Sequence, residues 1–218
     1  MYTLVSDVFH HKHLKHLLTY AVPKHKCTFL NIYLNSCGLV WEQRKLGQIA
    51  RIQGGGTPDS KNKDYWDGDI NWFTPTEVGH SVFLNESRIK ITKNGLDHSS
   101  AKLMPKDSIL MTSRAGVGSM GILNEPAATN QGFQSFILKS VYPYFIYAMQ
   151  PIISKIANKL ASGSTFTEIS GTEVKKISIA IPLDEAEQKS VGRMAKVLDD
   201  TIAANQCKQK GSQIYDPP

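Results

Sequence analysis

The loop from Asp59 to Gly68 carries side chains that are suited to binding chemistry. It places cations, an amide and aromatic rings close together, at Lys61, Asn62, Lys63, Tyr65 and Trp66. Lysine ammonium groups contact phosphates, while an asparagine amide can donate to and accept from base edges. The pattern fits contacts to phosphates and bases, and it fits an ordinary polar surface loop anchored by Trp66 nearly as well.

A second candidate is Arg114, which lies among small residues in the sequence TSRAGVGSMGI. The guanidinium group can form a bidentate pair of hydrogen bonds with guanine or with a phosphate. An arginine on a glycine-bordered loop is equally typical of a salt-bridge anchor.

The glycine-rich stretch Gly54 to Gly56, followed by Pro58, predicts a turn and not a nucleotide site. A phosphate-binding loop would read GxxxxGK[ST] or GxGxxG and would lead into a helix. Neither spacing is present, so the glycines are interpreted as a turn that tolerates close backbone approach.

Catalytic patterns are weak. A nuclease of the PD…(D/E)xK kind would use Asp59 with Glu173 and Lys175, but these residues lie more than a hundred positions apart. The final Tyr215 to Pro218 resembles the D-P-P-Y motif of amino-methyltransferases, yet the chain ends before the aromatic residue. The sequence therefore predicts no catalysis, with a metal-dependent nuclease and a protein-interaction module that does not read DNA as the alternatives.

Histidines and cysteines gather in Met1 to Val40, which holds five of the seven histidines. Structural zinc ligands usually pair at CxxC or HxxxH-like spacings, whereas Cys27 and Cys37 are ten positions apart. No metal site is predicted. Three cysteines at unrelated spacings argue against a disulfide framework and for a reducing compartment, so a cytoplasmic location is expected.

The formal net charge of +6 is unevenly distributed along the 218 residues. Residues 1–41 carry four lysines and one acid, residues 42–183 carry sixteen basic and twelve acidic side chains, and residues 184–218 carry five and six. The basic excess therefore lies upstream of the last segment, which is better suited to a protein contact than to nucleic acid. No apolar run approaches the ~20 residues that span a bilayer.

Periodicity predicts the elements that position these side chains. A helical patch is expected at Leu46–Ala50, a turn at Asn94-Gly95, and one buried helix, or two broken near Pro151, at Tyr142–Leu160. In the first forty residues, a short helix is expected at Lys12–Tyr20 and a strand at Thr28–Leu34. The remaining strands are expected at Ile70–Thr74, Ser87–Ile91, Ser108–Met111, Gln134–Leu138 and Val174–Ile181.

The stretch from Ala161 to Asn205 predicts a loop, a strand and a long helix. Asp184 is the expected N-cap, and Glu187 is its expected capping-box partner. A helix from Glu185 to Gln206 would be roughly 33 Å long. Its apolar residues recur at an a/d spacing, at Val191, Ala195, Leu198 and Ile202, with polar Asn205 next in the series. This pattern fits a helix that lies on its own domain, or one that projects to meet another helix.

Taken in order, several segments resemble the successive signatures of one family, the specificity subunits of type I restriction-modification enzymes. These segments are WEQRKLGQIARIQGGGTP, YWDGDINWFTPTEV, ITKNGLDHSSAKLMPKDSILMTSRAGVG, ATNQGF, ASGSTFTEISGTEVKKISIAIP and EAEQKSVGRMAKVLDD. The resemblance runs from Trp41 to Asn205. A full-length family member has two recognition domains and two long helices, whereas this chain shows one of each. Both ends of the chain fit products of frameshift or truncation.

The resemblance implies a target recognition domain that reads one half of a bipartite site in double-stranded DNA. It also implies a spacer helix that docks methyltransferase subunits within a complex that includes restriction subunits. Such a subunit has no catalysis and no cofactor of its own: S-adenosylmethionine is expected on the methyltransferase, and ATP and magnesium on the motor-nuclease. A homodimer through antiparallel C-terminal helices would rebuild the two-domain arrangement.

The resemblance implies an α+β fold, a globular mixed α/β recognition domain with a small twisted sheet, followed by a protruding C-terminal coiled-coil-type helix. Residues 1–40 would form an atypical segment for which poor order is one expectation, 41–183 the recognition domain, 184–206 the spacer helix and 207–218 a tail. The partner seam is predicted at Val191, Ala195, Leu198 and Ile202. DNA contacts are predicted at Thr57, Lys61, Asn62, Lys63, Thr74, Lys93, Asn94, Ser113, Arg114, Asn130, Gln131, Ser164 and Thr165.

Overall fold

The computed structural model describes residues 41–161 and 168–212, with the side chains of the last helix described as far as Asn205. The chain divides into two compact units. Unit 2 is Gln43–Ala180, and unit 1 combines Met1–Glu42 with Ile181–Pro218. The helix and strand expected within residues 1–40, and the predicted contacts Ser164 and Thr165, lie outside the described residues.

Unit 2 is built on a five-stranded sheet with the strand order β2-β9-β6-β7-β4. Neighbouring strands are antiparallel except β4 and β7, which are parallel. The central strands β6 and β7 consist mainly of apolar residues and are buried at every position, so burial of these side chains stabilises the sheet. The strands are β2 (Ala50–Gly54), β4 (Phe83–Leu84), β6 (Ile109–Met111), β7 (Met120–Leu123) and β9 (Gln134–Leu138).

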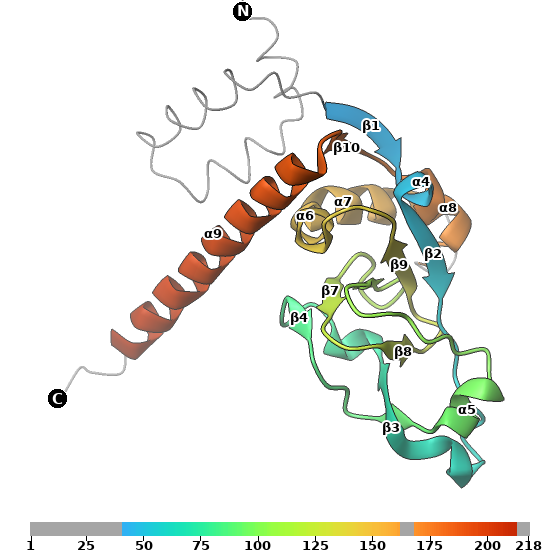
Figure 1. Ribbon diagram of the computed structural model, residues 1–218. Helices are drawn as coiled ribbons and strands as arrows, with labels where there is room; N and C mark the ends of the chain where they lie inside the picture. The colour runs from blue at the N-terminus through green and yellow to red at the C-terminus, as the bar shows by residue number, and fades with distance from the viewer. Residues whose placement is uncertain (1–40, 162–167, 213–218) are drawn as a thin grey trace, which may run out of the picture. The chain divides into compact units, whose positions relative to one another are not determined.

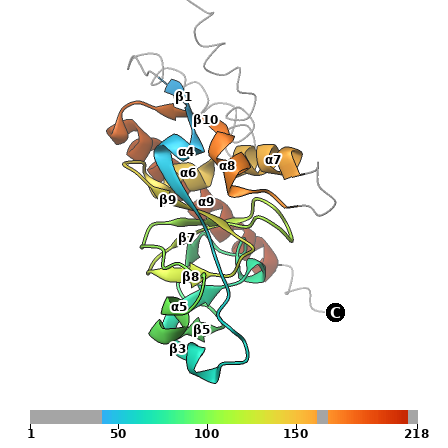
Figure 2. The ribbon, with the colours of Figure 1, turned by 90° about the vertical axis from the view of Figure 1, so that its right-hand side faces the viewer.

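A smaller sheet with the order β5-β3-β8 lies at one end of unit 2, and the helices α7 and α8 lie at the other (Figures 1 and 2). Strand β3 pairs antiparallel with β5 and parallel with β8, so β3 and β8 end side by side. Two 3-10 turns and a short helix surround this sheet. The elements are η1 (Lys63–Tyr65), β3 (Trp66–Phe73), η2 (Pro75–Glu77), β5 (Lys90–Ile91), α5 (Lys93–Asp97) and β8 (Ala127–Thr129).

Two apolar clusters support the sheets. Below the smaller sheet, Trp72, Ile91, Ala101 and Ala128 are buried together. A second cluster joins both sheets, because it takes residues from β3, β4, β6, β7 and β8. Its buried members are Phe73, Val78, Leu84, Met104, Leu110, Leu123, Ala127 and Phe133. Packing of this density fixes the relative positions of the loops at the strand ends.

Four short helices complete unit 2: α4 (Leu46–Ile49), α6 (Pro143–Ala148), α7 (Gln150–Ala161) and α8 (Gly171–Lys176). The predicted break near Pro151 is confirmed, since α6 and α7 are separated at Met149. Proline has no N–H to donate, and this costs nothing in the first turn of a helix. Pro151 is therefore accommodated as the second residue of α7, whereas it would interrupt a longer helix.

Two predicted elements, a strand and a turn, differ from the structure because of local capping. Val174 lies in α8 and not in a strand, because Ser170 caps that helix by accepting a hydrogen bond from the Glu173 N–H. Strand β10 begins only at Ser178. The Asn94-Gly95 dipeptide forms no hairpin turn; it lies in α5, whose N-cap Thr92 accepts a hydrogen bond from the Gly95 N–H. Local capping overrode the strand and turn patterns in both places.

Strands β1 (Trp41–Lys45) and β10 (Ser178–Pro182) form a two-stranded sheet, and α9 (Glu185–Ser212) follows. Asp184 caps α9 as predicted, since its carboxylate accepts a hydrogen bond from the Ala186 N–H at 3.1 Å. The predicted end at Gln206 is wrong: no proline lies between Cys207 and Ser212, and the helix continues to Ser212. Within the described helices, none is long and apolar enough to cross a membrane.

Candidate nucleic-acid interface

Four loops of unit 2 meet at Gly132 and are called here the four-loop cluster. They are Gly55–Pro58 after β2, Thr74–Thr76 after β3, Ser113–Gly118 between β6 and β7, and Asn130–Gly132 between β8 and β9. Because β3 and β8 are parallel neighbours, the residues after them emerge at the same edge. The topology therefore brings together segments that are far apart in the sequence.

Backbone hydrogen bonds fix these loops to one another. The N–H to carbonyl pairs are Gly56 to Thr129 at 2.8 Å, Asn130 to Phe73 at 3.1 Å, and Ser113 to Gly132 at 2.8 Å. Loops that are held by main-chain bonds to a packed scaffold can present side chains in a defined geometry.

Gly132 lies at the centre of the cluster, where side-chain atoms approach its backbone closely. A Cβ atom at this position would be 2.8 Å from Pro75 Cγ, 3.0 Å from Asn130 Oδ1 and 3.2 Å from Arg114 Nε. The glycine thus allows the loops that carry Pro75, Asn130 and Arg114 to close around one point.

Arg114 is half-buried in the cluster. Within residues 41–161 and 168–212, its guanidinium group forms no hydrogen bond or ion pair, so the salt-bridge interpretation of this arginine finds no acidic partner there. With respect to the described residues, all five of its N–H donors are therefore open to another molecule.

Polar groups on the other three loops are oriented by internal hydrogen bonds. The exposed Thr57 hydroxyl donates to Gln131 Oε1 at 2.6 Å. The Gly132 N–H donates to Asn130 Oδ1 at 2.8 Å. The Thr74 hydroxyl donates to Glu77 Oε2 at 2.6 Å.

Ser113 is a correction to the predicted contacts. Its side chain is 0% exposed, so the hydroxyl does not reach the surface on which Arg114 lies. Among the described residues, neither Ser113 Oγ nor the buried Thr129 Oγ1 has a hydrogen-bond partner. Both hydroxyls lie beneath the four-loop cluster and belong to its support.

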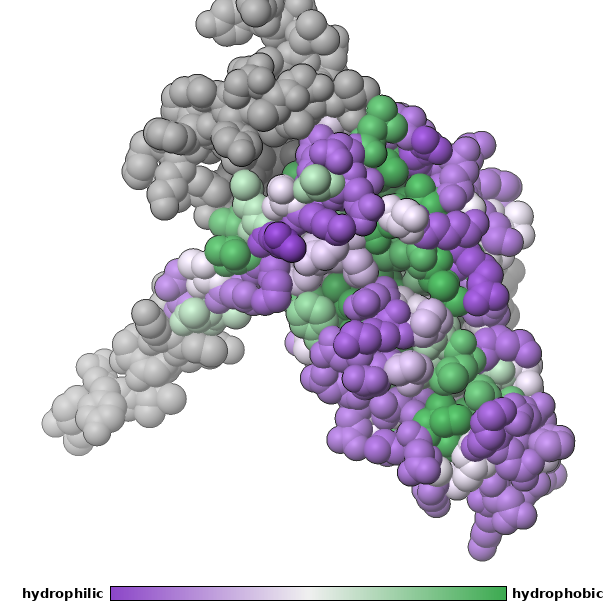
Figure 3. Space-filling model, viewed as in Figure 1, coloured by the Kyte–Doolittle hydropathy of each residue, from purple (hydrophilic) through white to green (hydrophobic). Residues whose placement is uncertain are grey.

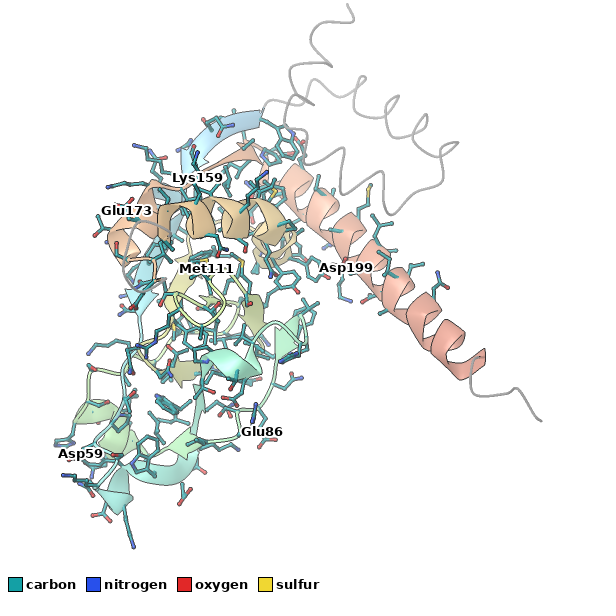
Figure 4. The ribbon with its side chains drawn as sticks, turned by 180° about the vertical axis from the view of Figure 1, so that it is seen from behind. Asp59, Glu86, Met111, Lys159, Glu173 and Asp199 are labelled. Atoms are coloured by element: carbon teal, nitrogen blue, oxygen red, sulfur yellow. The ribbon has the colours of Figure 1, made fainter. Side chains whose placement is uncertain are left out.

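The other predicted residues lie together at the end of unit 2 formed by η1 and α5, called here the α5 lobe. They are Lys61, Asn62, Lys63, Lys93 and Asn94. Most of this end, at the lower right of Figure 3, is hydrophilic. Figure 4 shows it from behind, with Asp59 far from Lys159 on α7 and Glu173 on α8. The sequence predicted one set of contacts, whereas the structure separates them into two groups.

The lobe is ordered by local hydrogen bonds. Asn62 Oδ1 accepts from the Asp64 N–H at 3.1 Å, so this amide is a helix cap. The Thr92 hydroxyl donates to the Asp64 carbonyl at 2.7 Å and joins α5 to η1. Lys93 is ion-paired with Asp97, whereas Lys61 and Lys63 form no ion pair within the described residues.

Two tryptophans hold the lobe near the cluster. Trp66 and Trp72 pack edge to face with ring centroids 5.4 Å apart. The Trp66 indole donates to the Asp59 carbonyl at 3.1 Å and anchors the loop, a contact that the surface-loop alternative includes. The Trp72 indole donates to the Gly56 carbonyl in the four-loop cluster at 2.9 Å. Trp72 thus links the two groups, a role that its sequence context did not indicate.

Sequence reasoning also missed Glu77, Gly132 and Pro75. Glu77 holds Thr74 twice, by accepting from its N–H at 2.8 Å and from its hydroxyl. The sequence Thr74-Pro75-Thr76-Glu77 is an S/T-x-x-E capping box, and that signal predicts this arrangement. No sequence signal marks Gly132, because its importance comes from loops that meet only in three dimensions.

Two carboxyl groups have shifted pKa values. The hydrogen bond and charge of Lys90, 2.7 Å away, lower the pKa of the exposed Glu86. In unit 1, burial raises the pKa of Glu187, although the hydrogen bond that Trp41 Nε1 donates at 2.7 Å opposes this effect. Glu187 therefore accepts from an indole and does not form the predicted capping box with Asp184. In the described part of the chain, no group of three His, Cys, Asp or Glu side chains is arranged to hold a metal ion.

Helix α9 carries a broader apolar face than the predicted seam. Val191, Ala195 and Leu198 are half-buried. Ile202 is 41% exposed, and two further residues beside the seam are also exposed, Met194 at 46% and Val197 at 63%. At 100° per residue these side chains share one side of the helix, so the apolar surface extends past the a/d positions.

Comparisons with known proteins identify the family of this fold. A family model described as the type I restriction modification DNA specificity domain matches residues 39–212. The type I restriction enzyme MjaIX specificity subunit of Methanocaldococcus jannaschii is 33% identical over 182 residues, which cover 81% of this chain and 41% of that protein. The HindI specificity subunit of Haemophilus influenzae is 28% identical over 170 residues, covering 74% and 37%. The chain thus spans about two fifths of the length of these relatives.

Solved structures share the fold. A chain from a study of complex assembly and conformational transition of the type I R-M system superposes with a TM-score of 0.62 at 21% identity, over 80% of this chain and 42% of that one. The HsdS subunit from Thermoanaerobacter tengcongensis gives a TM-score of 0.55 at 18% identity, over 78% and 40%. The expected mixed α/β class with a C-terminal helix is confirmed. On the match over residues 39–212 and the 33% identical relative, the chain belongs to the family of type I restriction-modification DNA specificity domains.

Proposed function

We propose that this chain recognises a short DNA sequence, one half of a bipartite site, for a type I restriction-modification complex. The observation that carries this proposal is the four-loop cluster at one edge of a packed unit. There Arg114, Asn130 and Gln131 present hydrogen-bond donors that no described residue engages. Base edges in the major groove are read by side chains of this kind.

The α5 lobe complements the cluster. Lys61 and Lys63 are exposed cations without an ion-pair partner among the described residues, so they are suited to phosphates. Lys93 is neutralised in part by Asp97 and contributes less. In this proposal the phosphate contacts supply salt-dependent affinity for DNA, and the four-loop cluster discriminates between base sequences.

Helix α9 serves assembly in this proposal. Its exposed apolar residues, Met194, Val197 and Ile202, form a hydrophobic face that is suited to a protein contact. The partners are methyltransferase subunits, with restriction subunits joining the complex, and a second copy of this chain can pair through antiparallel helices. Replacing Val197 by Lys should abolish association in sedimentation experiments. Thr201→Lys is the comparison, because it introduces the same charge at an exposed polar position nearby. It should impair association less.

The chain itself performs no reaction in this proposal. S-adenosylmethionine belongs to the methyltransferase, and ATP and magnesium belong to the motor-nuclease. Incubation of the purified chain alone with plasmid DNA and magnesium should leave the plasmid intact, and cleavage that is lost in an Asp59→Asn variant would contradict the proposal.

The DNA-recognition claim is tested by Arg114→Ala in the complex reconstituted with methyltransferase subunits. Loss of a bidentate base contact should weaken binding to the target duplex by about 1–3 kcal/mol and leave binding to unrelated duplexes nearly unchanged. Arg193→Ala also removes an arginine side chain, from an exposed position on α9 outside unit 2, and should preserve target preference. Equal target preference in the Arg114→Ala and unaltered complexes would show that the cluster does not read bases.

A further inference from the structure

We propose that the four-loop cluster reads a G·C base pair, with the amides of Asn130 and Gln131 and the guanidinium of Arg114 acting as donors. This inference rests on the proposed function and specifies the chemical class of base that the same site takes. It follows from which hydrogen-bonding atoms the protein has already used.

The amide oxygens of both Asn130 and Gln131 are engaged inside the protein. Gln131 Oε1 accepts from the Thr57 hydroxyl at 2.6 Å, and Asn130 Oδ1 accepts from the Gly132 N–H at 2.8 Å. Each bond also fixes which way its amide faces. An amide has two N–H donors and one carbonyl oxygen, so both residues present mainly their NH2 groups to a bound molecule.

Arg114 adds donors and no acceptor. Its guanidinium is half-buried beside Gly132, and among the described residues nothing pairs with it. Three neighbouring side chains on two loops are therefore biased towards donation.

The hydroxyl groups have the opposite bias. The Thr57 hydroxyl donates its proton to Gln131, and the Thr74 hydroxyl donates its proton to Glu77 at 2.6 Å. Each hydroxyl has one hydrogen, so Thr57 offers its lone pairs to a ligand. Thr74 offers fewer, because its oxygen also lies 3.2 Å from the Thr76 hydroxyl. The cluster thus combines several donors with one or two acceptors.

This combination matches one kind of base pair. In the major groove guanine shows two acceptors, N7 and O6, and its cytosine partner shows one donor, the N4 amino group. Adenine is read by an amide that accepts and donates at once, whereas each amide oxygen here already accepts one internal hydrogen bond and each NH2 group is engaged by no described residue. The donor excess therefore favours guanine over adenine.

The test determines the methylated motif of the complete complex, this chain with its methyltransferase subunits, by methylome sequencing. Positions read by Gln131 are those whose preference changes in Gln131→Glu, which replaces the NH2 donors by a carboxylate oxygen. We expect guanine at such a position in the unaltered complex, and a preference lowered by about 5- to 150-fold in the variant. Gln48→Glu makes the same change at an exposed position on α4 and should leave the motif intact.

Variants of Thr57 provide a second test. They should change base discrimination, which would not change if Thr57 had only a structural role. Thr57→Val frees Gln131 Oε1 to accept, so discrimination between guanine and adenine should fall at that position alone. Thr57→Ser keeps the hydroxyl and should retain the discrimination. Both positions are exposed, so folding is not at stake, and co-purification with the methyltransferase verifies assembly.

Adenine or thymine at the position altered by Gln131→Glu would overturn the G·C assignment while leaving DNA recognition intact. A motif unchanged by Gln131→Glu and by Thr57→Val would also overturn it. If the unaltered complex methylates no defined motif, the proposed function itself fails, and this inference fails with it.

Discussion

The indole Nε1 of Trp72 donates a hydrogen bond to the carbonyl oxygen of Gly56 at 2.9 Å. Trp72 is only 6% exposed and belongs to the apolar cluster of the smaller sheet, whereas Gly56 lies in the glycine-rich turn after β2. This bond joins the smaller sheet, beside which the α5 lobe lies, to the glycine-rich turn of the four-loop cluster.

Trp72→Phe should therefore destabilise unit 2 and weaken DNA binding together. The variant leaves the buried Gly56 carbonyl without its donor, a loss of about 1–3 kcal/mol, in addition to lost packing. Chemical denaturation measures the stability, and duplex titration measures the affinity. Trp66→Phe is the matched comparison, because its bond to Asp59 is exposed and its loss should cost less. If Trp66→Phe were the more damaging change, the linking role of Trp72 would be wrong.

Gly132→Ala should reduce DNA binding more than it reduces stability. The added Cβ would press on Pro75 Cγ, Asn130 Oδ1 and Arg114 Nε, all of them side-chain atoms that can move aside. The fold then persists while the cluster opens. Gly54→Ala is the control, because its Cβ would meet only the Phe133 carbonyl at 3.9 Å, an ordinary contact. Full target affinity in Gly132→Ala would mean that close packing of these loops does not matter.

A Lys61→Gln, Lys63→Gln double variant should weaken binding to all duplexes alike. If both lysines contact phosphates, the slope of log K against log salt concentration should fall by about 2, since each contact contributes about 0.9. The control is Lys159→Gln on α7, at the other end of unit 2 from Asp59 (Figure 4). An unchanged slope in the double variant would remove the α5 lobe from the DNA interface.

Glu187→Gln tests the electrostatics at the start of α9. Burial raises the pKa of Glu187 in the folded state, so folding favours the protonated carboxyl, and its contribution to stability is lost as pH rises through that pKa. Glutamine cannot ionise and retains an oxygen for the Trp41 indole. The stability of the variant relative to the unaltered chain should therefore increase between pH 4 and pH 7, as measured by thermal unfolding. A relative decrease over the same range would indicate a lowered pKa.

Helices and strands whose sequences carry a local signal, such as a proline or a capping residue, were predictable. Strand β9 has the predicted bounds Gln134–Leu138, and the break near Pro151 follows from the missing N–H of proline. Asp184 was recognisable as the N-cap of α9 because the preceding strand ends at Pro182. Val174 was misassigned because Val174 and Ile177 fit a strand face and a helix face equally well, and the Ser170 cap decides between them.

The candidate site was predictable as a list of residue types but not as an arrangement. Arg114, Gln131 and Thr57 were identified because their side chains suit DNA, yet the bond between Thr57 and Gln131 joins positions 74 residues apart. Ser113 has the same polar chemistry, and only the packing of Ile169 and Gly132 against its backbone reveals its burial. Which atoms remain free to bind depends on these long-range contacts.

The most direct measurement is methylome sequencing of a host that expresses the methyltransferase subunits with and without this chain. The account predicts one defined motif that appears only when the chain is present and is lost or relaxed in Arg114→Ala. Methylation that follows no motif, or the same motif without the chain, would contradict the claim that this chain reads DNA sequence.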